Sequence, residues 1–198
     1  MPNVTPDHSS IRDGSTLILS ATRAEARYVP AGGRVLITGI GKVRTAMTLT
    51  RALAAASHTA DDPPITRVIN IGTAGALHDH HAGLFLPSVV LEHDISSTEL
   101  RAMGYPVVDR WEIDGGDGTV LASGDTFVAD PVRRAQLAAR ADLVDMEACA
   151  VAQVSTEFGV PCRFVKVVSD GADEDSLDWP SLVDAAARQL GDWLAGTD

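Results

Sequence analysis

The sequence predicts an α/β protein in which a central mixed and twisted sheet lies between two layers of helices. Short apolar runs typical of buried strands alternate with helical patterns along most of the 198 residues. The clearest strand pattern covers residues 67–71, and the clearest amphipathic helix covers residues 148–158 and ends at Gly159. This alternation favours a layered sheet over a helical bundle or an all-β fold.

The remaining elements follow from the same periodicities. Further strands are predicted at residues 17–19, 34–38, 86–91, 120–123, 141–144 and 162–168. Further helices are predicted at residues 43–56, 131–141 and 180–194, and Asp130 and Pro131 are typical of the start of the second. We expect the stretch 72–75 (Gly-Thr-Ala-Gly) to end the third strand, and residues 95–119 to be irregular.

Length and composition indicate one domain. We expect a flexible polar tail at residues 1–14 and a single domain from 15 to 198, with 45% hydrophobic residues to build its core. The net charge of −11 and the lack of a Lys/Arg cluster argue against nucleic acid or anionic membranes as partners. Cys149 and Cys162 lie in apolar runs, which favours reduced thiols in a cytoplasmic protein.

Three local patterns could indicate cofactors or nucleophiles, and each has a simpler explanation. Gly39 and Gly41 follow a strand, but the third glycine of a dinucleotide-binding turn is absent, so a tight turn is favoured. The histidine-rich stretch 78–81 lacks distant metal partners, and a solvated loop is favoured. Cys149 lies in an apolar helix, where a core role is favoured. We therefore expect no metal and no organic cofactor.

Carboxylates follow two of the predicted strands. Asp145 and Glu147 come after the strand at 141–144, and Asp170 comes after the strand at 162–168. In open α/β sheets ligands bind beyond the carboxyl ends of strands, so these positions indicate a site that handles protons and hydroxyls. The alternative is that acidic residues at strand ends only cap helices.

Five segments, in order, resemble the nucleoside phosphorylase/nucleosidase superfamily, and most closely its methylthioadenosine/S-adenosylhomocysteine nucleosidases. The segments are residues 38–43 (TGIGKV), 69–75 (INIGTAG), 122–128 (ASGDTFV), 144–152 (VDMEACAVA) and 167–173 (VVSDGAD). The resemblance implies the phosphorylase/hydrolase-type fold, with the site at one edge of the sheet.

The resemblance also implies roles for eight residues. Asp170 would be the acid that protonates the leaving purine, and Glu25, a few residues after the first strand, would activate water. Glu147 would hold the ribose hydroxyls while Met146 packs on the sugar. The other substrate-binding residues implied are Phe127, which would stack on the base, Val128, whose backbone would bind the base edge, Thr73 and Ser169.

The function implied is hydrolysis of a purine nucleoside, such as methylthioadenosine or S-adenosylhomocysteine, to free base and sugar. The alternatives are a purine nucleoside phosphorylase, a futalosine-type hydrolase, or a nucleoside-binding protein without activity. Asn70 stands where related phosphorylases carry a phosphate-binding arginine, which favours hydrolysis. Arg23 and Arg27 lie near Glu25 in the sequence and could partly substitute.

The chain departs from the family in two places. Only one strand fits between Glu25 and Gly39, where the family has a hairpin, and a helix is missing between Gly104 and Ser123. The resemblance further implies a homodimer, a cytoplasmic location and a place in methionine salvage.

Overall fold

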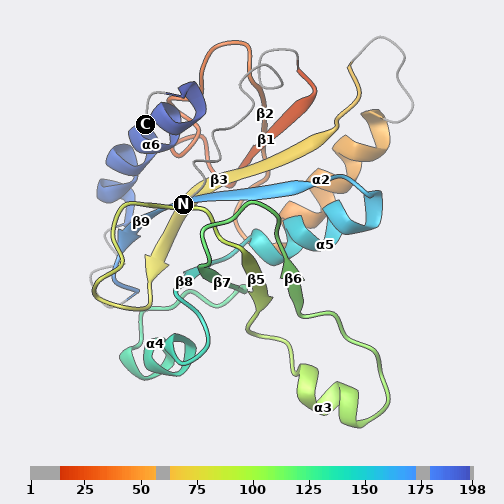
Figure 1. The fold of residues 1–198 in the computed structure, drawn as a ribbon, viewed down its shortest axis with the longest axis vertical. Helices are drawn as coiled ribbons and strands as arrows, with labels where there is room; N and C mark the ends of the chain where they lie inside the picture. The colour runs from red at the N-terminus through yellow and green to blue at the C-terminus, as the bar shows by residue number, and fades with distance from the viewer. Residues whose placement is uncertain (1–13, 57–62, 173–178, 197–198) are drawn as a thin grey trace.

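The computed structural model describes residues 14–56, 63–172 and 179–196. The tail predicted at residues 1–14 falls almost wholly outside these ranges and stays a prediction. Within them lies one sheet of nine strands with helices on both faces (Figure 1). This arrangement confirms the predicted α/β/α layering and the mixed, central sheet. None of the helices described is long and apolar enough to cross a membrane.

The strands follow the apolar runs of the sequence. Their bounds are β1 Thr16–Ser20, β2 Arg34–Ile37, β3 Arg67–Ala76, β4 Leu84–Phe85, β5 Val89–Glu92, β6 Arg110–Glu112, β7 Val120–Ser123, β8 Leu143–Asp145 and β9 Cys162–Asp170. The order in the sheet is β2-β1-β3-β8-β7-β5-β6, and β9 pairs with both β3 and β4. Strands β1, β2, β3 and β9 are parallel to one another where they pair, whereas β8 joins β3 antiparallel.

Strand β3 is the centre of the sheet because it changes partners along its length. Its first half pairs with β1, its last residues, Gly75 and Ala76, pair with β8, and β9 accompanies it from Val68 onward. The register with β9 shifts between Ala74 and Gly75, where the strand has a bulge. Near its end, Gly75 of β3 therefore lies between Val144 of β8 on one side and Asp170 of β9 on the other.

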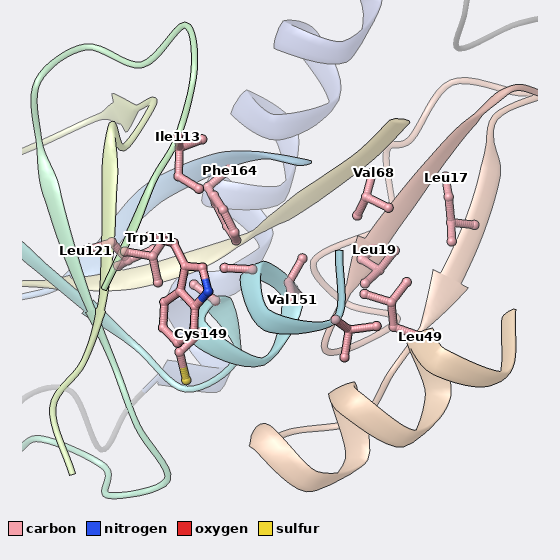
Figure 2. Close-up of a cluster of buried hydrophobic side chains, with 14 of the residues drawn as sticks. Leu17, Leu19, Leu49, Val68, Trp111, Ile113, Leu121, Cys149, Val151 and Phe164 are labelled. Carbon is pink, nitrogen blue, oxygen red and sulfur yellow. The ribbon is translucent and has the colours of Figure 1, made fainter. Parts of the chain in front are cut away.

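The helices are α2 Lys42–Ala56, α3 Ser97–Ala102, α4 Pro131–Ala138, α5 Ala148–Phe158 and α6 Trp179–Ala195. Helices α2 and α5 lie together on one face of the sheet, and α6 covers β3 and β9 on the other (Figure 1). Alternating side chains of each strand supply the two cores: Leu17 and Leu19 face α2, whereas Ile18 packs with Leu190 of α6. Figure 2 shows the α2–α5 side, where Leu49 and Val151 meet the sheet.

The largest error of the sequence-based prediction is the end of β3. The glycines at 72 and 75 do not terminate the strand, which continues to Ala76. A Cβ at Gly72 would lie 3.0 Å from Glu25 Oε1, and one at Gly75 would lie 3.1 Å from Asp170 Oδ1. Both glycines are therefore explained by the close approach of carboxyl groups to the strand, and not by a turn.

Other boundaries differ by smaller amounts. The segment expected to be irregular contains α3 and β6, and the strand expected at 86–91 is replaced by β4 and β5. Helix α4 ends at Ala138, three residues early, and β9 extends to Asp170. Helix α3 has no buried residue, so its sequence has no apolar stripe from which a helix could be predicted.

Candidate active site

A pocket of about 290 Å³ lies beside residues 73–75 of β3, where the chain leaves the carboxyl ends of β1, β8 and β9. All eight residues singled out from the sequence line it: Glu25, Thr73, Phe127, Val128, Met146, Glu147, Ser169 and Asp170. Its walls are mainly apolar, with Ala21, Ile40, Ala74 and Val144 among them. An apolar cavity with a few converging polar groups is the usual form of a small-molecule site.

Glu25 is held rigidly, although it lies outside any helix or strand. Its carboxylate is buried, and Oε2 accepts hydrogen bonds from Thr22 N at 3.1 Å, Thr22 Oγ1 at 2.8 Å and Ser20 Oγ at 3.4 Å. Oε1 accepts from Thr73 N at 2.9 Å and Thr73 Oγ1 at 3.1 Å. These donors form a cradle that fixes the buried carboxylate where it lines the pocket.

The arginines next to Glu25 in the sequence do not accompany it. Arg23 and Arg27 are exposed, and neither lines the pocket. Arg27 instead lies 3.4 Å from Asp184 of α6. The cation near Glu25 is Lys166, whose Nζ lies 3.5 Å from the place of a Cβ at Gly72. This geometry gives no support to Arg23 and Arg27 as substitutes for a phosphate-binding arginine.

Lys166 is the site residue that sequence reasoning missed. It lies in the middle of β9, and its Nζ forms an ion pair of 2.7 Å with Asp145 Oδ2. Burial by itself lowers the pKa of Lys166, but the charges of Asp145 and Glu147 outweigh that effect and raise it. A lysine within an otherwise apolar strand was the available signal, since a buried ammonium needs carboxylate partners.

Glu147 lies directly before α5, with Met146 beside it in the pocket wall. Its Oε1 accepts a hydrogen bond of 2.8 Å from the backbone N–H of Gly41. Burial, assisted by the charge of Asp145, raises the pKa of Glu147 to about 8, while Lys166 opposes the shift. Burial therefore favours the protonated form of the Glu147 carboxyl in the empty pocket, against the charge of Lys166.

Asp170 ends β9, and two local hydrogen bonds orient it. Ser169 Oγ donates to Asp170 Oδ2 at 2.6 Å, and the backbone N–H of Ala172 donates to Oδ1 at 2.9 Å. Ala172 has a left-handed backbone with a φ of 50°, which closes this turn onto the carboxylate. The chain after β9 thus holds the Asp170 side chain against Gly75 of β3.

Phe127 and Val128 follow the turn after β7. The Phe127 side chain is 47% exposed and lines the pocket, whereas Val128 is buried beneath it. An exposed aromatic ring at the mouth of an apolar pocket offers a face for stacking against a flat ligand. The structure therefore brings together all the residues predicted for the site.

Comparisons with known proteins agree with this geometry. A family model described as the phosphorylase superfamily matches residues 117–192. Among curated proteins, an aminodeoxyfutalosine nucleosidase of Helicobacter pylori is 28% identical, over 93% of this chain and 93% of that protein. A 5′-methylthioadenosine/S-adenosylhomocysteine nucleosidase of Shewanella frigidimarina is 29% identical, over 77% of this chain and 76% of that protein.

Solved structures extend the likeness to the fold. A 5′-methylthioadenosine/S-adenosylhomocysteine nucleosidase of Helicobacter pylori superimposes with a TM-score of 0.76 at 25% identity, covering 92% of this chain and 96% of that one. A futalosine hydrolase mutant of the same organism gives 0.76 at 24%, covering 92% and 97%. These likenesses all point to the nucleoside phosphorylase/nucleosidase superfamily, whose members this chain resembles in sequence and fold. The fold predicted from the sequence, that of this superfamily, is confirmed.

The residues of the other sequence patterns do not line the pocket. The rings of His78, His80 and His81 contact one another in tilted and edge-on arrangements in a loop. No group of side chains within the described ranges has the composition of a metal site. Gly39 and Gly41 have φ values of 85° and 94°, as a tight turn requires. Burial raises the pKa of Cys149 to about 12, which removes it from thiolate chemistry at neutral pH.

Proposed function

We propose that this protein hydrolyses the N-glycosidic bond of an adenosine-type nucleoside and releases the free purine and the sugar. The observation that carries the proposal is the convergence of Glu25, Glu147 and Asp170 on one apolar pocket from three distant parts of the chain. Glu25 follows β1, Glu147 follows β8 and Asp170 ends β9, and each carboxyl group has its own hydrogen-bond donors. Three such groups are what cleavage of a nucleoside requires.

Asp170 is the proposed general acid. When the bond between C1′ and the purine nitrogen breaks, the bonding electrons pass to the base, and a proton delivered to its N7 neutralises the developing charge. Ser169 Oγ and the Ala172 N–H hold the Asp170 carboxyl in one orientation, which is the condition for efficient proton transfer. The adjacent Gly75 leaves room for the Asp170 carboxyl and the Ala172 side chain to lie against β3.

Glu25 is the proposed general base. A water molecule placed between its carboxylate and the far face of the sugar would lose its proton to Glu25 as its oxygen bonds to C1′. The cradle of Thr22, Thr73 and Ser20 fixes the carboxylate, so no reorganisation is needed during the reaction.

The remaining residues bind the substrate in this proposal. A carboxylate accepts two hydroxyl hydrogen bonds well, which suits Glu147 to the ribose diol, and Met146 packs against the sugar. Phe127 stacks on the purine, and the backbone of Val128 binds the base edge. Thr73 and Ser169 orient the two reacting carboxyl groups and complete the pocket wall.

The geometry favours water over phosphate as the attacking group. The backbone and hydroxyl donors of Thr22 and Thr73 are already used by the Glu25 carboxylate, whose negative charge repels phosphate. Neither Arg23 nor Arg27 lines the pocket, so no guanidinium from this segment is in place to clamp an anion. Hydrolysis is therefore preferred to phosphorolysis.

The relatives suggest two kinds of substrate. One bears the name of a methylthioadenosine/S-adenosylhomocysteine nucleosidase and another that of an aminodeoxyfutalosine nucleosidase, and the pocket is compatible with either class. We propose a 5′-modified adenosine such as methylthioadenosine as the main substrate, with a futalosine-type nucleoside as the alternative. A role in methionine salvage applies only to the first.

A homodimer is proposed from the surface of α2 and the preceding turn. Ile40, Val43 and Met47 are 54%, 76% and 54% exposed and lie at helical spacing, which forms an apolar stripe beside the pocket. A second copy of the chain that covers this stripe would also narrow the pocket entrance at Ile40. The cytoplasmic location expected from the sequence stays a prediction.

A panel of purine nucleosides incubated in phosphate-free buffer and analysed by mass spectrometry tests the proposal. We expect release of adenine from at least one 5′-modified adenosine, at a rate that added phosphate does not change. A rate that depends on phosphate, with a pentose 1-phosphate as product, would indicate a phosphorylase. Binding without turnover across the panel would indicate a nucleoside-binding protein.

A further inference from the structure

Two segments that line opposite parts of the pocket are joined by a closed ring of hydrogen bonds. One is the turn at residues 39–42 before α2, and the other is the loop at residues 124–128 after β7. The backbone N–H of Lys42 donates to Asp125 Oδ1 at 2.7 Å, and the backbone N–H of Asp125 donates to Asp94 Oδ2 at 2.8 Å. Lys42 Nζ closes the ring on Asp94 Oδ1 at 2.7 Å.

The ring of Lys42, Asp94 and Asp125 is anchored to the body of the sheet. Lys42 Nζ also donates to Glu92 Oε1 at 2.6 Å, at the end of β5. Burial alone lowers the pKa of Lys42, but its hydrogen bonds to Asp94 and Glu92 raise it overall, so the ammonium is retained throughout the physiological range. The side chains of Lys42, Asp94 and Glu92 are only 23%, 15% and 16% exposed, which shields these contacts from solvent.

Each of the joined segments bears on a different part of the pocket. In the turn, the N–H of Gly41 donates to Glu147 Oε1, the carboxyl proposed to hold the ribose. In the loop, Phe127 is the ring proposed to stack on the base. A Cβ at Gly41 would lie 2.9 Å from Asp125 Oδ1, so the two segments could not approach this closely with a larger residue there.

We propose that the ring of Lys42, Asp94 and Asp125 sets the distance between the ribose-binding and base-binding parts of the pocket, and that Asp125 is the positioning residue at its centre. The inference rests on the proposed function, because it assigns Glu147 to ribose and Phe127 to base. Asp125 does not line the pocket and acts only through the segments that it joins. A ligand that spans both parts depends on the ring, whereas a free purine, which contacts the loop and Asp170 but neither the turn nor Glu147, does not.

The matched variants are Asp125→Ala and Asp125→Asn. Asparagine keeps an oxygen that can accept the hydrogen bond of the Lys42 N–H, whereas alanine leaves that donor unpaired. We expect Asp125→Ala to lower kcat/KM for the nucleoside about tenfold, the usual effect of losing one charged hydrogen bond, while inhibition by free adenine changes less than about twofold. Asp125→Asn should recover most of the loss.

A second measurement needs no substrate. Amide hydrogen exchange should become faster in both segments, 39–42 and 124–128, in Asp125→Ala but not in Asp125→Asn, because the ring ties one to the other. Equal weakening of nucleoside and free adenine would overturn the inference, since it would indicate a disrupted loop. Unchanged exchange in the turn of Asp125→Ala would also overturn it. Absence of turnover in the wild type contradicts the proposed function but leaves the exchange test decisive for the ring.

Discussion

Lys166 Nζ lies 2.7 Å from Asp145 Oδ2, and the two side chains are 2% and 1% exposed. This ion pair lies beneath the pocket, where the Lys166 charge also acts on Glu147 and Glu25. Asp145 in turn accepts from the backbone N–H of Ala148, at the start of α5. One lysine therefore compensates the carboxyl groups that the site concentrates at the centre of the sheet.

Breaking this pair should destabilise the protein strongly. We expect Lys166→Met to lower the free energy of unfolding by about 3–5 kcal/mol, because it leaves Asp145 charged, buried and without its cation. Denaturant unfolding followed by circular dichroism measures the loss. The double variant Lys166→Met with Asp145→Asn should regain a large part of it, since no unpaired charge then remains. A double variant as unstable as the sum of the single variants would show that the pair is not coupled.

Glu147 should make stability depend on pH. Its pKa of about 8 in the empty folded pocket lies above the ordinary value of 4.5, so between these values the folded state binds a proton that the unfolded state has lost. Stability therefore falls as pH rises through this window, by at most about 1.4 kcal/mol per pH unit. Glu147→Gln should flatten this slope in unfolding experiments carried out between about pH 5 and pH 8. An unchanged slope in the variant would show that Glu147 is ionised in the folded state.

The site could be predicted largely because its residues follow strands. Asp170 and Glu147 follow apolar runs, and ligands of α/β sheets bind beyond the carboxyl ends of strands, so the sequence predicts both as site residues. That their strands, β8 and β9, run in opposite directions and meet at Gly75 of β3 could not be predicted. Glu25 has no such pattern and was placed by resemblance. Its support comes from Thr73, which is 48 positions away in the sequence, and a contact of that kind has no local signature.

The errors of the prediction have a common physical cause. A glycine can indicate a turn or the close approach of another group, and only the fold distinguishes the two. At Gly72 and Gly75 the approaching groups are Glu25 and Asp170, so the strand continues where local rules end it. Lys166 was missed for a related reason, since its partner Asp145 comes from a different strand.

Replacing the proposed acid should separate binding from catalysis. Asp170→Asn can still accept from Ser169 and hydrogen-bond the base, but it cannot protonate N7. We expect the rate of base release to fall by about 10²–10⁴-fold, with a much smaller change in KM. Steady-state kinetics against methylthioadenosine measure both, and Asp114→Asn, an exposed aspartate outside the pocket, is the control for loss of charge. Near-normal turnover of Asp170→Asn would remove this residue from the mechanism.

Replacing the proposed base gives the sharpest test of the water-activating role. Glu25→Gln fills the same cradle of threonine and serine donors but cannot take a proton from water, so hydrolysis should be lost while a non-hydrolysable nucleoside analogue still binds. Glu99→Gln on α3, which lies outside the pocket, should behave as wild type.

The cradle itself provides the positive control. In Glu25→Ala its donors lose their carboxylate, and added formate, a free carboxylate of the right size, should restore part of the hydrolysis that the variant has lost. Formate should not restore Glu25→Gln, because the amide still occupies the cradle. We expect this difference because rescue requires both an empty place and donors that orient the anion. Normal turnover of Glu25→Gln, or equal rescue of both variants, would mean that water is activated elsewhere in the pocket.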